Sequence, residues 1–139
     1  MAIPQDILRD IQLLIFDLDG TLVDSKTDLA LSVNAMRAQM GMDRLAHELI
    51  ASYVGHGVNN LVRRALADQA TEETVAKGML IFLDYYRRHM LDNTVLYPGV
   101  RETLEELHGR KLAVLTNKPV NFSREMLTAW KEELLWRLY

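Results

Sequence analysis

Apolar residues follow two different patterns along the chain. Residues 11–16 and 111–115 are short, nearly unbroken apolar runs, and polar or turn-forming residues follow each of them at once. Such runs are typical of strands that are buried on both faces of a parallel sheet. Between the two runs, apolar positions recur at helical spacing. The pattern therefore predicts an α/β protein in which a helical insertion separates two strands.

Four helices are expected in the insertion. Residues 25–28 (Ser-Lys-Thr-Asp) have the pattern of a capping box, with Asp in place of the usual Glu, and apolar positions at helical spacing lead to Gly41. Further helices are predicted over residues 46–53 and 58–68, and Thr71 caps a fourth that reaches residue 90. Because the apolar stripes are long enough to face one another, we expect these helices to form a cap domain over residues 24–96.

The segments on either side of the cap, residues 1–23 and 97–139, predict a partial Rossmann-like core. One helix opens at Pro98 and Gly99 and ends at Gly109, and Pro119 suits the first position of another that continues from Lys118 into the tail. The chain crosses between core and cap twice, at residues 22–25 and 93–96. We expect both crossings to act as hinges.

Composition narrows the class of protein. The chain has 139 residues, a formal net charge of −3 and no cysteine. This charge gives no reason to expect nucleic acid as a partner, and no apolar run reaches the length that spans a membrane. The lack of cysteine excludes disulfides and thiolate metal sites, and it fits a reducing compartment. With no signal-peptide pattern at the N-terminus, a cytoplasmic protein is expected.

The strongest chemical signal is the pair Asp17 and Asp19, directly after the first predicted strand. Two carboxylates this close repel each other unless a cation lies between them, and oxygen ligands favour Mg²⁺. Asp17 is then placed to attack phosphorus, and Asp19 to protonate the leaving oxygen. Gly20 allows a sharp turn, with its N–H toward the phosphate. The alternatives are a plain Asp-Gly turn or a calcium loop, but a calcium loop follows a helix rather than a strand.

Residues 17–25 (Asp-Leu-Asp-Gly-Thr-Leu-Val-Asp-Ser) resemble the first motif of the haloacid dehalogenase-like phosphatases. The length of the helical insertion resembles the four-helix cap of the phosphoglycolate phosphatase and β-phosphoglucomutase branch. Residues 114–119 (Val-Leu-Thr-Asn-Lys-Pro) resemble the second motif of that branch, most closely in phosphoglycolate phosphatases. The likeness covers roughly residues 11–129.

The resemblance implies a Mg²⁺-dependent phosphatase that acts on 2-phosphoglycolate or a similar small phosphate ester. It makes Asp17 the nucleophile and a metal ligand, and Asp19 the acid and base, with its backbone carbonyl on the metal. The Thr116 hydroxyl and the Asn117 backbone N–H would bind a phosphate oxygen. Lys118 either contacts the phosphate or is a solvated lysine.

Gly55, His56 and Gly57 lie where the cap of this family carries its substrate-specificity loop. The alternative is that a histidine between two glycines is a flexible turn. Both interpretations stay open on the sequence alone.

The likeness stops near Trp130. The family pattern continues with a lysine and an acidic cluster on later strands, whereas no Asp follows Asp92 in this chain. We therefore expect low activity, and the alternative function is an inactive truncated remnant or interaction module. Residues 130–139 suggest a frameshifted or prematurely ended product. Their apolar stripe predicts a helix that covers the sheet, or self-association through this helix or the open sheet edge.

Overall fold

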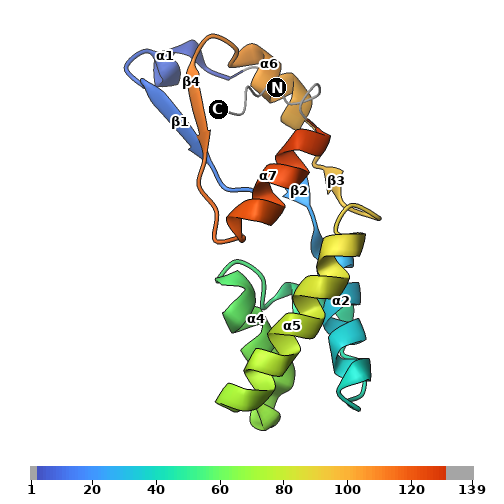
Figure 1. The fold of residues 1–139 in the computed structure, drawn as a ribbon. Coiled ribbons are helices and arrows are strands. Elements are labelled where there is room, and N and C mark those ends of the chain that lie inside the picture. Colours follow the sequence, from blue (N-terminus) through green and yellow to red (C-terminus); the bar gives the residue numbers. More distant parts are fainter. Residues whose placement is uncertain (1–2, 131–139) are drawn as a thin grey trace.

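The computed structural model describes residues 3–130 and has the α/β architecture that the sequence predicts. Figure 1 shows two groups of elements, one around the strands β1 and β4 and the other around the helices α2, α4 and α5. The chain passes from the first group to the second and back. In order, the elements are α1 (Gln5–Leu8), β1 (Leu13–Phe16), β2 (Val23–Asp24), α2 (Lys26–Gln39), α3 (His47–Ala51), α4 (Gly57–Leu66), a 3₁₀ turn (Ala67–Gln69), α5 (Glu72–His89), β3 (Val95–Leu96), α6 (Val100–Glu106), β4 (Lys111–Val114) and α7 (Val120–Ala129).

The two predicted apolar strands, β1 and β4, pair in parallel, with Phe16 opposite Val114. The expectation that they are buried on both faces is wrong for β1. Phe16 and Val114 pack against the core, but Leu13 is 49% exposed and Ile15 is 56% exposed. The reason is that, in the described part of the chain, this sheet has two strands and only one face rests on the core. Self-association through the sheet stays a prediction.

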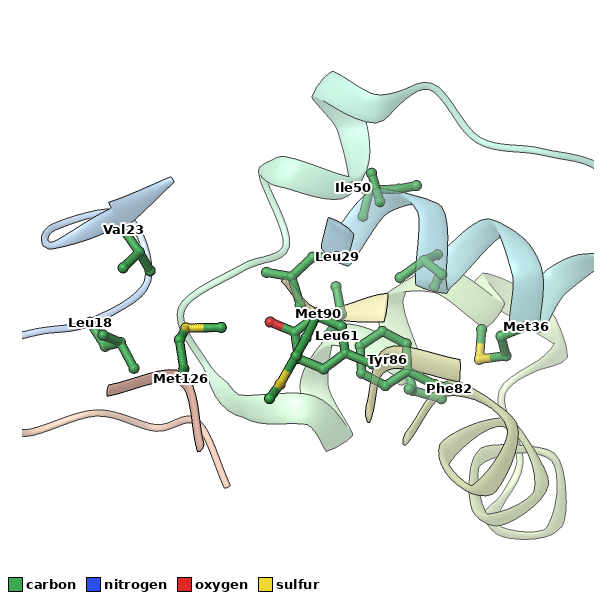
Figure 2. Close-up of a cluster of buried hydrophobic side chains, with 14 of the residues drawn as sticks. Leu18, Val23, Leu29, Met36, Ile50, Leu61, Phe82, Tyr86, Met90 and Met126 are labelled. Atoms are coloured by element: carbon green, nitrogen blue, oxygen red, sulfur yellow. The ribbon is translucent and has the colours of Figure 1, made fainter. Parts of the chain in front are cut away.

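Helices α2 to α5 pack as the insertion predicted. Helix α2 lies against α3 and α5, and α4 lies against α5. Figure 2 shows their shared interior, where Met36, Phe82 and Tyr86 are almost completely buried. The predicted N-terminus of α5 is confirmed, because Thr71 and Thr74 form a reciprocal capping box. Gly41, just past α2, has the left-handed φ of 73° that suits a helix end.

The capping box predicted at the start of α2 is not formed. Ser25 is the N-cap residue, but its side chain makes no capping hydrogen bond and instead donates to Asp19. The carboxylate of Asp28 accepts hydrogen bonds from Asn93 and Thr94, which follow the end of α5. Both side chains therefore take tertiary partners in place of the local ones.

The two predicted crossings are joined to each other by a short ladder that the sequence did not indicate. Strands β2 and β3 are antiparallel, with Val23 opposite Leu96 and Asp24 opposite Val95. A strand of two residues is too short to show a periodic pattern. The single turn of α1 was not predicted for the same reason. We keep the division into a cap over residues 24–96 and a core on either side as a proposal, which this ladder supports.

The last two helices follow the glycine and proline signals closely. Gly99 is the N-cap of α6, and Gly109 follows its end with a φ of 88°. Pro119 is the N-cap of α7 rather than its first residue, so the helix starts two residues after Lys118. The helix was expected to continue into the tail without a break, but α7 ends at Ala129 with Trp130 as its C-cap residue. The rest of the predicted tail helix, residues 131–139, lies outside the described residues. Within the part that the structure covers, no helix combines the length and apolar character needed to cross a membrane.

Candidate active site

A small cavity lies between the carboxyl ends of β1 and β4 and the cap helices. Its volume is about 50 Å³, which leaves room for a short organic group. Polar side chains from the core form one wall and apolar side chains from the cap form the other. The residues that line it are Asp17, Asp19, Leu29, Val54, Gly55, Gly57, Val58, Leu61, Tyr86, Thr116, Asn117, Lys118 and Pro119.

Asp17 follows β1 directly and is exposed at the mouth of this cavity. The backbone N–H of Leu18 donates to Asp17 Oδ1 over 2.7 Å. Leu18 itself is completely buried, which anchors the turn on which both acidic residues lie. Among the described residues, Asp17 Oδ2 has no hydrogen-bond partner. One carboxylate oxygen is thus held while the other is open to a ligand.

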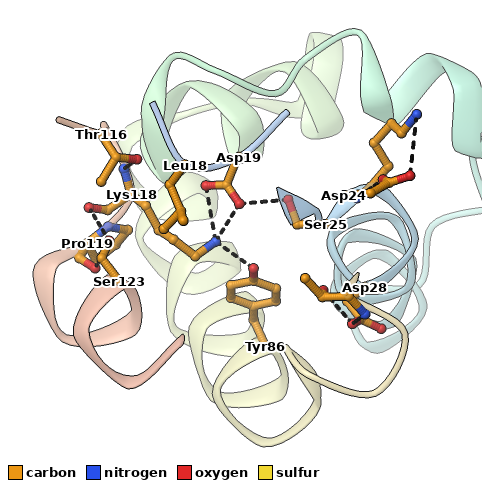
Figure 3. Close-up of polar contacts among 12 residues, drawn as sticks. Leu18, Asp19, Asp24, Ser25, Asp28, Tyr86, Thr116, Lys118, Pro119 and Ser123 are labelled. Atoms are coloured by element: carbon orange, nitrogen blue, oxygen red, sulfur yellow. Dashed lines mark hydrogen bonds and ion pairs between the residues drawn. The ribbon is translucent and has the colours of Figure 1, made fainter. Parts of the chain in front are cut away.

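Asp19 is held from two sides, as Figure 3 shows. The Ser25 hydroxyl donates to Asp19 Oδ1 over 2.6 Å, and the Lys118 ammonium lies 3.1 Å from the same oxygen. These contacts leave the Asp19 side chain only 13% exposed. Its orientation toward the cavity is therefore set by one residue from the start of α2 and one from the loop after β4.

Gly20 makes the sharp turn that was predicted, with a φ of 82°. The expectation that its N–H faces the phosphate is wrong. This N–H donates to the Val23 carbonyl over 2.9 Å, and Gly20 does not line the cavity. This hydrogen bond stabilises the turn between the acidic motif and β2.

Lys118 is a buried cation, so the solvated alternative is wrong. Its side chain is 4% exposed, its ammonium pairs with Asp19, and it also donates to the Tyr86 hydroxyl over 2.5 Å. The ammonium lies 4.5 Å from the centroid of the Tyr86 ring, within cation–π range. Burial lowers the pKa of Lys118, and the Asp19 carboxylate opposes this effect.

Thr116 and Asn117 connect the core to the cap. Thr116 Oγ1 accepts the backbone N–H of Lys118 over 3.1 Å, which leaves the hydroxyl proton free for a ligand. Asn117 Nδ2 donates to the Gly55 carbonyl over 2.8 Å. The second motif therefore reaches both the cavity and the predicted specificity loop.

The predicted specificity loop is only partly at the cavity. Gly55 and Gly57 line it, whereas His56 is exposed and does not. Gly57 has a φ of 85°, a left-handed conformation that favours glycine, and an added Cβ there would only touch the Asn117 carbonyl oxygen, at 3.7 Å. A substrate-facing role for His56 stays a prediction.

Two residues of the site were missed by the sequence analysis. Ser25 was interpreted as a helix cap, and Tyr86 as one member of an apolar stripe on α5. Tyr86 does belong to the core through its ring, which stacks on Phe82 and meets Phe122 edge-on. Periodicity reveals the packing of the ring but not the contact of the hydroxyl with Lys118.

The residues at the cavity fit a magnesium ion in part. Asp17 offers one oxygen without a partner, which is a suitable hard ligand. The Asp19 carboxylate is already held by Ser25 and Lys118, so only its backbone carbonyl suits the metal. Among residues 3–130, no group of three or more acidic, histidine or cysteine side chains is arranged to hold a metal. Water would have to complete the coordination shell.

Comparison with known proteins now identifies the family. The family model described as haloacid dehalogenase-like hydrolase matches residues 14–135, most of the chain. The chain belongs to this family. The match includes all of β1 except Leu13, all of β4 and all of the cap helices.

Several similar curated proteins are named phosphoglycolate phosphatase. The protein from Vibrio parahaemolyticus is 42% identical over 127 residues, which are 86% of this chain and 56% of the relative. The protein from Chromobacterium violaceum is 44% identical over 117 residues, which are 80% of this chain and 53% of the relative. The chain thus spans about half the length of the curated relatives it matches.

A solved structure agrees with the fold. The crystal structure of a predicted phosphoglycolate phosphatase from Haemophilus somnus superposes with a TM-score of 0.83 at 36% sequence identity. The match covers 91% of this chain and 60% of that structure.

Proposed function

We propose that this chain carries the nucleophile half of a phosphomonoester hydrolase of the phosphoglycolate phosphatase type, with 2-phosphoglycolate or a similar small ester as substrate. The observation that supports this most is the convergence of Asp17, Asp19 and Thr116 on one small cavity that the cap closes. The names of the curated relatives add the substrate class.

The chemistry proceeds in two displacements at phosphorus. An oxygen of the Asp17 carboxylate attacks phosphorus, and the bond to the ester oxygen breaks as Asp19 gives that oxygen a proton. Asp19 then takes a proton from water, whose oxygen attacks the aspartyl phosphate and releases inorganic phosphate and the free Asp17 carboxylate. Thr116 and the Asn117 N–H stabilise the phosphoryl oxygens throughout.

Mg²⁺, when bound, neutralises negative charge on the phosphoryl group. In the proposed site, Asp17 and the Asp19 backbone carbonyl would hold it, and water would supply its remaining ligands. Because the described residues offer so few acidic ligands, we expect weak metal binding and slow turnover by this length of chain.

The test is Mg²⁺-dependent phosphate release from 2-phosphoglycolate by the purified chain and by Asp17→Asn. We expect the variant to lose the activity. Asp24→Asn is the matched control, since Asp24 lies in the same motif but does not line the cavity, and Lys26 is the partner of its carboxylate among the described residues. Equal rates for the chain and Asp17→Asn would refute the proposal and favour the non-enzymatic alternative.

A further inference from the structure

The hydroxyl group of Tyr86 is a buried donor that has no acceptor among the described residues. Tyr86 is 1% exposed, and its oxygen accepts the hydrogen bond from Lys118. Within residues 3–130 this is the only hydrogen bond of the Tyr86 hydroxyl, so its own proton is not donated. Buried polar groups are normally satisfied, and an unused donor that lines a cavity points to a missing ligand.

Among the described contacts of Lys118, Asp19 and Tyr86, this proton is the donor that stays unused. The Lys118 ammonium has three N–H groups, and its three acceptors are Asp19 Oδ1 at 3.1 Å, Asp19 Oδ2 at 3.3 Å and the Tyr86 oxygen at 2.5 Å. Figure 3 shows the Tyr86 hydroxyl and the Asp19 carboxylate on the same ammonium. A ligand beside Lys118 therefore finds the Tyr86 O–H as an unused donor.

The protonation states suit recognition of an anion. Burial raises the pKa of the Tyr86 phenol, and the charges of Asp19 and Asp28 raise it further, so the hydroxyl stays a neutral donor. The adjacent Lys118 supplies positive charge at short range. A cation next to a neutral O–H donor is the combination that binds a carboxylate through a charge-assisted contact.

The position of the pair favours the alcohol part of a substrate over its phosphoryl group. In the proposed reaction, phosphorus lies at Asp17 and Thr116, while Asp19 faces the leaving oxygen. Lys118 contacts Asp19 and, on the side of the cap, Tyr86. A group bonded one or two carbons from the leaving oxygen is then placed beside them in the cavity.

We propose that Tyr86 is a specificity-determining residue that donates a hydrogen bond to a carboxylate on the alcohol part of the substrate, with Lys118 as the counter-charge. This inference rests on the proposed function, because that function places the phosphoryl group. It restricts the substrate class to short phosphate monoesters whose alcohol carries a carboxylate.

The test compares two esters that differ at the carboxylate. For 2-phosphoglycolate and for ethyl phosphate, kcat/KM is measured with the chain, with Tyr86→Phe and with Tyr85→Phe as control. Tyr86→Phe keeps the buried ring and removes only the hydroxyl. We expect it to lower kcat/KM for 2-phosphoglycolate about tenfold or more relative to kcat/KM for ethyl phosphate, as loss of a charge-assisted hydrogen bond does. Equal losses for both esters, or no loss for either, would overturn the inference.

A binding measurement tests this inference independently of the proposed hydrolysis. Calorimetric titration gives the affinity of each ester for the chain and for Tyr86→Phe, whether or not the ester is turned over. Weaker binding of 2-phosphoglycolate alone in Tyr86→Phe supports the inference even where no hydrolysis is found. Equal affinity of the unmodified chain for both esters overturns it even where hydrolysis is found. Failure of both esters to bind overturns both proposals.

Discussion

Removal of the Asp28 carboxylate should strongly destabilise the protein at residues 93–96, where the chain returns from the cap to the core. Asp28 is 1% exposed and accepts four hydrogen bonds of 2.7–2.9 Å, from the backbone N–H and side chain of Asn93 and of Thr94. Asp28→Ala leaves all of these donors without their acceptor. Asn93 is exposed, so water can replace the carboxylate there, but Thr94 is only 6% exposed.

The two donors of Thr94 therefore determine how much the free energy of unfolding falls. An unsatisfied buried donor costs about 1–3 kcal/mol, so Asp28→Ala should lower the free energy of unfolding by about 4 kcal/mol. A domain of this size is stabilised by about 5–15 kcal/mol, so the loss is a large fraction of the whole. At an m-value of about 2 kcal/mol per molar urea, the unfolding midpoint falls by about 2 M.

Urea unfolding followed by circular dichroism measures this change. Asp84→Ala is the control, because Asp84 forms an exposed ion pair with Arg88, and such pairs contribute about 0.5 kcal/mol or less. A loss for Asp28→Ala below about 1 kcal/mol, or no greater than that of the control, would refute the idea that these hydrogen bonds hold the crossings together.

Three other changes probe separate features. Ser25→Ala should slow phosphate release and cost about 1 kcal/mol, because Asp19 loses its hydroxyl partner; an unchanged rate would contradict this role. Gly78→Ala should lower stability by about 1 kcal/mol in urea unfolding, because overpacking outweighs the gain in helix propensity. The new Cβ would lie 3.1 Å from Val62 Cγ1. The raised pKa of Tyr86 means that only the unfolded phenol ionises above about pH 10, so stability falls as pH rises, by up to about 1.4 kcal/mol per unit. Tyr86→Phe should lack this part of the pH dependence, and an unchanged slope would contradict it.

Features that depend on nearby residues were predictable from the sequence. The apolar runs at β1 and β4 and the cap of α5 by Thr71 follow from patterns within a few residues, and the structure confirms them. The glycines at 41 and 99 likewise lie where the chain needs a left-handed turn. The acidic motif also predicted which strand end carries the site, since ligands bind at the carboxyl ends of parallel strands.

Features that depend on distant partners were not predictable. The pattern of Ser25 and Asp28 fits a local capping box, yet Asp28 bonds to residues 65 and 66 positions further along the chain. Tyr86 fits an apolar stripe because its ring does pack in the core, and nothing in the periodicity separates the ring from the hydroxyl. Lys118 lies in a polar loop, so its burial follows only once α5 packs across it. In each case tertiary packing decided between two local alternatives.

Trapping of the phosphorylated protein tests the central claim, that Asp17 is a nucleophile, most directly. The chain is mixed with 2-phosphoglycolate and Mg²⁺, quenched in acid within the first turnover, digested and analysed by mass spectrometry. We expect one phosphoryl group on the peptide that contains Asp17, and none on the same peptide from Asp17→Asn. Phosphate release by the chain with no phosphoryl group on Asp17, or with the group on another residue, would contradict the account.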